Sequence, residues 1–404
     1  MRRLWMGPLC LLFCSVLALP GAASAARPPK EAAAKPRQAA AGAKEKEAPA
    51  KAAEKPYKGA ILIEAESGQV LEEDNADERL IPASIVKMMV MLIVAEAVQK
   101  GVHKLDEMVN TSALASKIGG SQVYLKQGER FTLEEMLKAI SIASANDASY
   151  AVAEHMTGSV EAFVQLMNQR AKQLGMANTL YHSVHGLPPG PGEEADYTTA
   201  RDTAILAREI VKHSALLKWT STWREPFRDG KFILLNTNNR LLRTFRGMDG
   251  IKTGYYGEAG FNLCATAKRE GMRLVSVVLG ATTRPIRDRE SSRLLLQGFR
   301  LYKKENLFVK VKELEKPVAV AGAKKPATLL APAAPVSVLV KRLEAPDVKT
   351  RLRLPSPLAA PLAKGQKVGE LEAVLGDKVI AKTPVVATED VAQKTLLDRV
   401  MFWK

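Results

Sequence analysis

Residues 81–87 read IPASIVK, and they open a stretch from Ser84 to about Gln99 whose apolar residues recur at helical spacing. Ser84 and Lys87 stand three positions apart, so on a helix they share one face and the amine can reach the hydroxyl. The positive end of the helix dipole would stabilise an oxyanion that forms at this N-terminus. Ser84-Ile85-Val86-Lys87 is the only Ser-x-x-Lys in the chain, but such a pair is weak evidence by itself because it arises easily by chance.

Two further short motifs follow in order. Ser144-Ala145-Asn146 falls in a turn between helical runs, where a hydroxyl and an amide could pass a proton and hold a carbonyl. Lys252-Thr253-Gly254 stands just ahead of an expected strand. Its Lys and Thr can bind a carboxylate, and Gly254 would let an extended substrate approach the backbone closely. The ordered triple is far more specific than any one of its members.

The motifs lie in a stretch, residues 57–305, that has the pattern of one α/β domain. A hairpin is expected at 60–64 and 69–72, around a turn at 66–68. Helical spacing covers 84–99, 133–156, 160–174, 199–212 and about 288–303, and strand signals cover 231–234, 260–267 and 273–279. This order predicts a sheet that joins both ends of the domain.

The C-terminal part has a different character. Residues 306–390 alternate short β-like runs (336–340, 351–354, 367–371 and 378–380) with Pro and Gly turns, which predicts a small β-rich domain. In 391–404, one helix face would carry Leu396, Leu397, Val400, Met401 and Trp403. This amphipathic helix is expected to lie in an anionic membrane surface, with Phe402 and Trp403 inserted. The alternative is a terminal helix packed on its own domain.

The N-terminal residues have the pattern of an export signal. Residues 1–25 combine Arg2 and Arg3, an apolar run and a small-residue site at Ala23-Ser24-Ala25, which predicts cleavage before Ala26. An uncleaved anchor is the alternative, and in both cases the protein would be exported to the periplasm. Residues 26–56 contain no Val, Ile, Leu, Met or aromatic residue, so a disordered tail is expected there.

The composition excludes several classes of function. The chain has 404 residues, 47% hydrophobic and 25% charged, which is the balance of a soluble globular protein. Of its net charge of +16, residues 1–25 carry +2, the tail carries +4 and the region from Asn306 carries +7, which leaves +3 for residues 57–305. Because this basic surplus is peripheral and lacks interleaved aromatic residues, no nucleic-acid partner is expected.

The cysteine and histidine residues predict neither a disulfide nor a metal site. After removal of the signal only Cys264 remains, so no intrachain disulfide is possible, and its apolar surroundings predict a small buried residue. The histidines are His103, His155, His182, His185 and His213, and they never show a metal-ligand spacing such as His-Glu-x-x-His. The sequence also has no Gly-rich loop of the kind that binds phosphate. We therefore expect no metal and no cofactor, with His182 and His185 making loop hydrogen bonds.

The ordered triple resembles the signature of the penicillin-recognising serine enzymes. The stretches between the motifs are similar to one branch, the low-molecular-mass penicillin-binding proteins that are D-alanyl-D-alanine carboxypeptidases. The supporting stretches are 81–84, 119–121, 143–147, 185–187, 197–202, 249–254 and 259–263. The resemblance is dense over 57–305 and looser in the C-terminal part. It implies an antiparallel sheet with helices on both faces plus a helical subdomain, followed by the β-rich domain.

The resemblance also implies roles for these residues. Ser84 would attack the carbonyl of the penultimate D-alanine of a peptidoglycan stem peptide, and a neutral Lys87 would take its proton. Ser144 would relay a proton to the leaving group, and Asn146 would orient Lys87 and the substrate amide. The backbone N–H groups of Ser84 and Tyr255 would hold the oxyanion.

The same resemblance assigns the terminal carboxylate of the substrate to Lys252, Thr253 and Arg287, with Arg284 and Arg289 as close competitors in the loop. β-Lactam antibiotics would then be covalent inhibitors that acylate Ser84. Two departures from the family pattern are Ala145, where Gly is more usual, and the Pro- and Gly-rich segment 188–194, which could reshape one wall of the cleft.

Three other functions stay open. A β-lactamase would share the nucleophile and could use Glu193 or Glu194 as a water-activating base, although a long C-terminal extension is not needed for that activity. An endopeptidase that cuts D-alanyl cross-links is a close variant. A non-catalytic wall-binding protein would keep the fold without the chemistry, against which the intact motifs argue.

Overall fold

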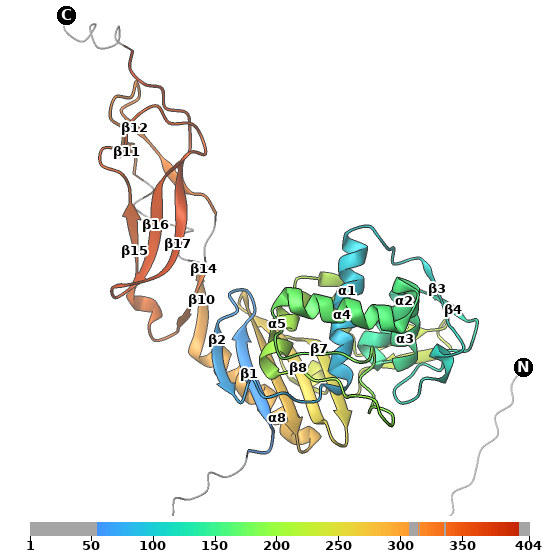
Figure 1. Ribbon diagram of the computed structural model, residues 1–404. Coiled ribbons are helices and arrows are strands. Elements are labelled where there is room, and N and C mark those ends of the chain that lie inside the picture. Colours follow the sequence, from blue (N-terminus) through green and yellow to red (C-terminus); the bar gives the residue numbers. More distant parts are fainter. Residues whose placement is uncertain (1–54, 307–313, 315, 335–336, 396–404) are drawn as a thin grey trace, which may run out of the picture. The chain divides into compact units, whose positions relative to one another are not determined.

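The computed structural model describes residues 55–306, 314, 316–334 and 337–395, and every structural statement below concerns these residues (Figure 1). The signal sequence expected at 1–25, all but the end of the expected tail, and residues 396–404 lie outside the described residues.

A five-stranded antiparallel sheet, in the order β2-β1-β9-β8-β7, is the centre of the larger domain. Its strands are β1 (Gly59–Glu64), β2 (Val70–Asp74), β7 (Met248–Tyr256), β8 (Gly260–Arg269) and β9 (Met272–Ala281). The first hairpin of the domain pairs with β9, near the end of the domain, so the sheet joins both ends as the sequence predicts. The Lys-Thr-Gly motif stands ahead of the predicted strand β8, but it lies inside edge strand β7, which the sequence pattern did not predict.

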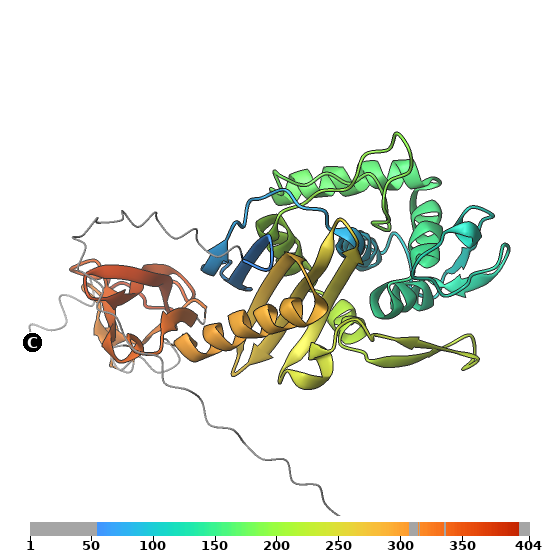
Figure 2. The ribbon, with the colours of Figure 1, turned by 90° about the horizontal axis from the view of Figure 1, so that it is seen from below.

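Both faces of the sheet are covered, which explains why β1 and β9 are buried almost throughout, whereas the edge strand β2 is partly exposed (Figure 2). Ile61 and Ile63 point into a core shared with helices α1, α3, α4 and α5, whereas Ala60 and Leu62 point into a second core with α8. This alternation follows from the two-residue period of a strand. The helices are α1 (Lys87–Gln99), α3 (Asn146–Thr157), α4 (Val160–Leu174), α5 (Ala200–Ile210) and α8 (Arg284–Leu301).

Shorter elements complete this domain. They are η1 (Ala83–Val86), η2 (Ala115–Lys117), α2 (Leu133–Lys138), η3 (Ala139–Ala143), α6 (Ser214–Thr220) and α7 (Leu241–Thr244), with hairpins β3 (Met108–Asn110)/β4 (Arg130–Thr132) and β5 (Arg224–Phe227)/β6 (Phe232–Leu235). Cys264 is fully buried, as its apolar surroundings predict.

The helical run over 133–156 is interrupted at Ser144-Ala145-Asn146, and the turn predicted there between helical runs is confirmed. Helix α2 passes into one π-helical turn, η3, and ends where Ser144 adopts a left-handed conformation with φ of 62°. Ala145 is extended, so α3 begins anew at Asn146. Helix α8 also begins earlier than expected, at Arg284, because the Thr283 hydroxyl caps it by accepting the N–H of Ile286 at 3.3 Å.

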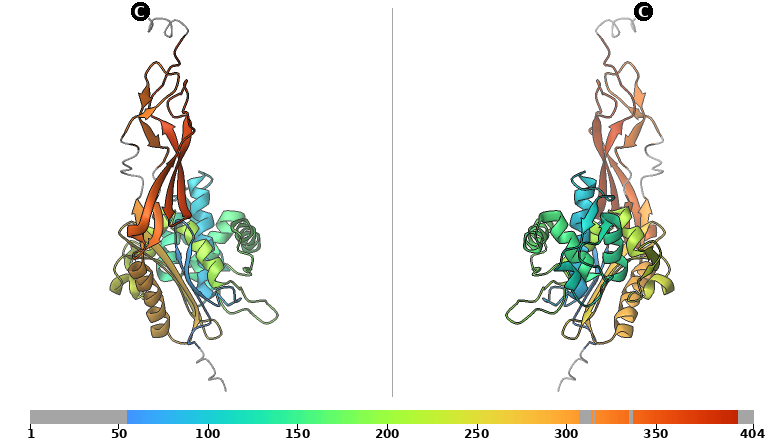
Figure 3. Two further views of the ribbon diagram at one scale, coloured as in Figure 1. Left: turned by 90° about the vertical axis from the view of Figure 1, so that its left-hand side faces the viewer. Right: turned by 90° about the vertical axis from the view of Figure 1, so that its right-hand side faces the viewer.

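The C-terminal region is β-rich, as expected (Figure 3). A four-stranded sheet has the order β13-β17-β16-β15, and two further pairs are β10/β14 and β11/β12. These strands are β10 (Tyr302–Asn306), β11 (Val318–Ala319), β12 (Ala327–Thr328), β13 (Leu330–Pro332), β14 (Ser337–Lys341), β15 (Val348–Arg353), β16 (Lys367–Leu375) and β17 (Lys378–Ala387), with a short helix η5 (Ala345–Asp347).

The helix expected from 391 onward is wrong over its first residues. Val391 is buried and forms an antiparallel bridge with Leu362, and Gln393 forms one with Ala323. These residues therefore complete the β-rich region. No helix within the described residues is long and apolar enough to cross a membrane.

Candidate active site

The turn before α1 presents Ser84 and Lys87 to each other. Ala83 adopts a left-handed conformation with φ of 49°, which is costly for a residue with a side chain and is typical of functional sites. The Lys87 amine lies 2.9 Å from Ser84 Oγ and donates to the carbonyl of His185 at 2.5 Å. Lys87 is completely buried. The structure therefore brings this predicted pair together and adds a carbonyl that sequence reasoning did not assign to the site.

The second motif comes from the break between η3 and α3. Ser144 Oγ accepts a hydrogen bond from the Lys252 amine at 2.9 Å, which links the second motif to the third. The Asn146 amide donates to the carbonyl of Gly119 at 2.7 Å rather than to Lys87. Its Oδ1 atom is buried and accepts no hydrogen bond from the described part of the chain.

A buried carboxylate holds the loop that faces this motif. Asp147 accepts the N–H groups of Val123 and Leu125 at 3.0–3.2 Å, and the N–H of Asn146 donates to the carbonyl of Ser121 at 2.7 Å. The negative charge of Asp147 in the first turn of α3 also suits the helix dipole. These bonds fix Ser121 beside the second motif.

Two glycines allow backbones to meet around Ser84. A Cβ on Gly254 in strand β7 would lie 2.4 Å from the carbonyl oxygen of Pro82, and one on Gly186 would lie 2.1 Å from that of Ala83. Both distances are impossible for a side chain, so only glycine fits. The Asn262 amide secures the same segment by donating to the carbonyls of Ile81 and Pro82 at 2.9 and 3.1 Å.

The three motifs border one cavity of about 200 Å³, which is lined by Ser84, Ser121, Ser144, Asn238, Thr253, Gly254, Tyr255, Phe261, Arg284 and Arg287. Of the three arginines considered from the sequence, Arg284 and Arg287 reach this cavity and Arg289 is not in its lining. Arg287 is buried, and its guanidinium is held by the carbonyl of Asn238 and the carboxylate of Asp288, each at 2.7 Å.

Sequence reasoning missed some of this lining. Ser121 stands in one of the stretches that carried the family resemblance, so a signal for it existed. Asn238 had none, since it lies in a loop after β6 without a motif. Tyr255 is 57% exposed and stacks on Phe261 with ring centroids 4.1 Å apart, which forms an aromatic wall of the cavity.

Burial gives the site its electrostatic character. Desolvation and the neighbouring charge of Lys252 hold the pKa of Lys87 well below its ordinary value. Desolvation and the charge of Arg287 lower the pKa of Lys252 to about 7. Burial and the charge of Lys87 lower the pKa of His185 to about 4, so this imidazole is neutral. A neutral amine beside a serine hydroxyl can act as a general base.

Comparison with known proteins settles which family this arrangement belongs to. A family model described as D-alanyl-D-alanine carboxypeptidase matches residues 44–283, and one described as the penicillin-binding protein 5 C-terminal domain matches residues 302–393. This chain belongs to the D-alanyl-D-alanine carboxypeptidase family. The resemblance drawn from the three motifs is confirmed.

Individual relatives agree over most of the chain. The D-alanyl-D-alanine carboxypeptidase DacF of Bacillus subtilis is 42% identical over 351 residues, which cover 85% of this chain and 89% of that protein. The crystal structure of penicillin binding protein 5 from Haemophilus influenzae matches with a TM-score of 0.69 and 30% identity, over 85% of this chain and 99% of that one.

A third relative carries an antibiotic. Penicillin-binding protein D2 from Listeria monocytogenes, in its ampicillin-bound form, matches with a TM-score of 0.55 and 30% identity, over 60% of this chain and 98% of that one. The present protein is thus a D-Ala-D-Ala carboxypeptidase of the penicillin-binding protein family, a serine hydrolase with a role in cell-wall remodelling.

The carboxylates considered as β-lactamase bases have other partners in this carboxypeptidase. Glu193 accepts the N–H of Gly190 at 2.8 Å and so closes its own loop. Glu194 is 81% exposed and lies 3.5 Å from His182. Neither residue is in the lining of the Ser84 cavity. His185 makes the expected loop hydrogen bond, since its Nδ1 accepts the N–H of Leu187 at 3.2 Å.

Lys252 is expected to make the stability of this carboxypeptidase depend on pH. Its pKa is about 7 in the folded protein and would be ~10.4 when exposed, so between these values the unfolded chain binds more protons than the folded chain. Stability therefore rises with pH across that window. In thermal unfolding, the Tm of the wild type should rise by several degrees relative to the Tm of Lys252→Met as the pH is raised from about 7 to 10. Parallel Tm curves for the two proteins would contradict this.

Proposed function

We propose that this carboxypeptidase removes the terminal D-alanine of a peptidoglycan stem pentapeptide through an acyl-enzyme on Ser84. The observation that carries the proposal is the 2.9 Å contact between the Lys87 amine and Ser84 Oγ, at a cavity bordered by all three motifs. In this mechanism Ser84 Oγ attacks the carbonyl of the penultimate D-alanine while its proton passes to Lys87.

The position of Lys87 suits a base. When the amine is neutral, one N–H can stay on the His185 carbonyl, 2.5 Å away, while the lone pair faces Ser84 Oγ. The carbonyl thus orients the lone pair toward the proton that it must take. Desolvation, the main cause of the low pKa of Lys87, favours the neutral amine, whose lone pair can take the proton.

The remaining steps use the groups around Ser84. The backbone N–H groups of Ser84 and Tyr255 stabilise the oxyanion of the tetrahedral intermediate. Ser144, hydrogen-bonded to the Lys252 amine, relays the proton that Lys87 took from Ser84 to the amine of the leaving D-alanine, so that Lys87 is neutral again. Asn146 Oδ1 accepts the N–H of the substrate amide. Water then attacks the acyl-enzyme, with Lys87 again as the base, and releases a peptide shortened by one residue.

A digest of a synthetic stem pentapeptide tests this function. Mass spectrometry should show loss of a single alanine, and a dimeric cross-linked peptide should be cut far more slowly if the enzyme is a carboxypeptidase rather than an endopeptidase. A chromogenic cephalosporin should give a slow, persistent acyl-enzyme. Turnover of many molecules per second would instead identify a β-lactamase.

We further propose that Lys252, Thr253 and Arg287 hold the terminal carboxylate of the substrate, and Arg287→Gln tests the part of the arginine. Loss of one charge-assisted contact should lower kcat/KM for a D-Ala-D-Ala peptide by about 10- to 100-fold. For a thioester substrate that has no terminal carboxylate, the change should be under about 3-fold. Steady-state kinetics on both substrates provides the measurement.

Arg289→Gln is the matched control, because Arg289 is an exposed neighbour on α8 that does not line the cavity. It should leave both substrates unaffected. If Arg287→Gln slowed both substrates equally, the role of Arg287 would be structural and carboxylate recognition would be assigned to other groups.

We also propose that the enzyme is exported and is attached to the outer face of the cytoplasmic membrane by residues 396–404. The sequence supports this through the expected signal and the apolar face of the C-terminal segment. Truncation after Thr395 is the appropriate test, because residues up to Gln393 are bridged to the β-rich region.

The truncated enzyme should move from the membrane fraction to the soluble fraction and keep its activity on a short peptide. Replacing Leu397 and Trp403 by Ser in the full chain should have the same effect without shortening the protein. Unchanged fractionation of both variants would reject the anchor.

A further inference from the structure

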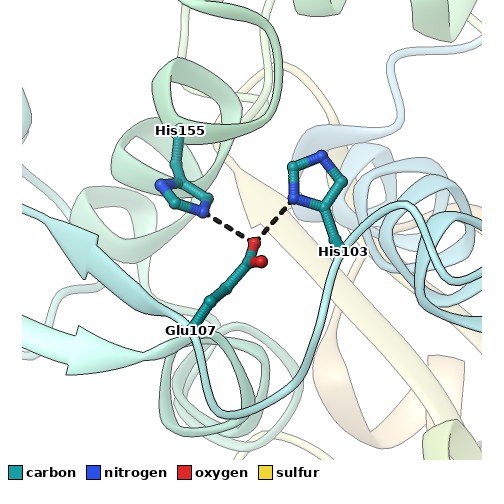
Figure 4. Close-up of side chains that lie close together, drawn as sticks. All are labelled: His103, Glu107 and His155. Atoms are coloured by element: carbon teal, nitrogen blue, oxygen red, sulfur yellow. Dashed lines mark hydrogen bonds and ion pairs between the residues drawn. The ribbon is translucent and has the colours of Figure 1, made fainter.

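Two histidines far apart in the sequence meet at one glutamate, at a place distinct from the Ser84 cavity (Figure 4). His103 Nδ1 lies 2.6 Å and His155 Nε2 lies 2.7 Å from the same oxygen, Oε1 of Glu107. All three ligand atoms lie within 4.8 Å of one another. The side chains are 20–26% exposed, so an ion from solution can reach them.

Rigid backbone positions these groups. His103 and Glu107 belong to the loop that follows α1, and this loop is tied to the end of the helix by the N–H of Val102, which donates to the carbonyl of Ala97 at 3.0 Å. At its other end, the carbonyl of Glu107 accepts the N–H of Leu133 at 2.9 Å. His155 is in the last turn of α3. The three side chains therefore need no folding step to meet.

The chemistry of this group suits a transition-metal ion. Two imidazole nitrogens and one carboxylate oxygen form a donor set that binds Zn²⁺, with a water molecule as fourth ligand. The second oxygen of Glu107 accepts the N–H of Lys104 at 3.1 Å, the kind of outer contact that orients a metal-binding carboxylate.

We propose that His103, Glu107 and His155 bind one Zn²⁺ ion, which clamps the loop after α1 to the end of α3. Ligand atoms in a tetrahedral zinc site lie about 3.3 Å apart, so the His–Glu contacts must open by roughly 0.6 Å, a small side-chain rotation. The ion would stabilise the two helices whose opposite ends carry Lys87 and Asn146. Its effect is therefore on stability and not on the chemical step.

The test uses the purified full chain without an affinity tag, stripped of metal by a chelator. Titration with Zn²⁺ against a chromogenic competitor should show one ion bound per chain, and Co²⁺ should give the visible absorption of a tetrahedral site. At about 100-fold excess over Kd, Zn²⁺ should raise Tm by about 5–10 °C. Mg²⁺ should have no effect, because imidazole is a poor ligand for it.

The double variant His103→Gln/His155→Gln should bind Zn²⁺ at least 100-fold more weakly and lose the Tm shift. His213→Gln, which changes a half-buried histidine outside the group, is the matched control and should bind like the wild type. Circular dichroism checks the fold of each variant. If the double variant does not fold, Glu107→Gln takes its place, since the amide keeps the shape of the carboxylate. Absence of stoichiometric binding, or undiminished binding in a folded variant, would overturn the proposal.

Discussion

Ser84→Ala abolishes covalent labelling by fluorescent penicillin and lowers kcat/KM for a D-Ala-D-Ala peptide by at least about 10³-fold. This is the largest effect that we expect, because no acyl-enzyme can form without Oγ. The hydroxyl contacts the Lys87 amine at 2.9 Å and donates a long hydrogen bond to the His185 carbonyl at 3.5 Å, so its removal should leave the fold intact. Gel fluorescence after a long incubation and release of D-alanine are the two measurements.

Two further serine variants make this result specific. Ser144→Ala should still be labelled, more slowly, because Ser144 acts in proton transfer and does not bond to the acyl group. Ser116→Ala is the matched control, since Ser116 lies in η2 and caps only its own turn through the carbonyl of Ala113. Persistent labelling of Ser84→Ala would show that another side chain is the nucleophile, and the proposed mechanism would fail.

Lys87→Met should lower the rate of acylation by about 10³- to 10⁴-fold while the protein stays folded. General bases typically contribute 10²–10⁴-fold, and here the same amine also orients the nucleophile. Methionine fills a similar volume in this fully buried place and cannot be charged, so the cost of desolvating the amine disappears. The Tm should be equal to that of the wild type or higher. Stopped-flow acylation by penicillin and thermal unfolding are the measurements.

The pH profile separates a base from a structural lysine. Wild-type acylation should rise with pH as Lys87 loses its proton, because burial and Lys252 hold its pKa well below the ordinary value. This rise should be absent in Lys87→Met. Lys100→Met, at the exposed C-terminal end of α1, should retain both the rate and the profile. A normal rate of acylation in the folded Lys87→Met protein would contradict the role of Lys87 as the base.

Much of the fold followed from local patterns. The hairpin β1/β2, the helices α1, α4 and α5, and the strands β8 and β9 lie where apolar periodicity predicted them. The reason is physical, since apolar residues that recur every 2 residues in a strand or every 3.6 residues in a helix mark the face of the element that is buried. The turn predicted at 144–146 interrupts the helical run over 133–156 as expected, but its conformation depends on contacts that are not local. Ser144 is held left-handed where its hydroxyl meets Lys252 and its neighbour Asn146 bonds to Ser121, both from distant segments.

By itself, the sequence determined the chemistry of the nucleophile, because a hydroxyl and an amine three residues apart need only one helical turn to meet. Only the tertiary structure decided what surrounds them. The His185 carbonyl that orients Lys87, the Asn238 carbonyl that holds Arg287 and the pairing of His103 with His155 at Glu107 all join distant segments. The spacing of residues along the sequence does not predict such contacts, since they depend on how the helices pack against the sheet and against one another.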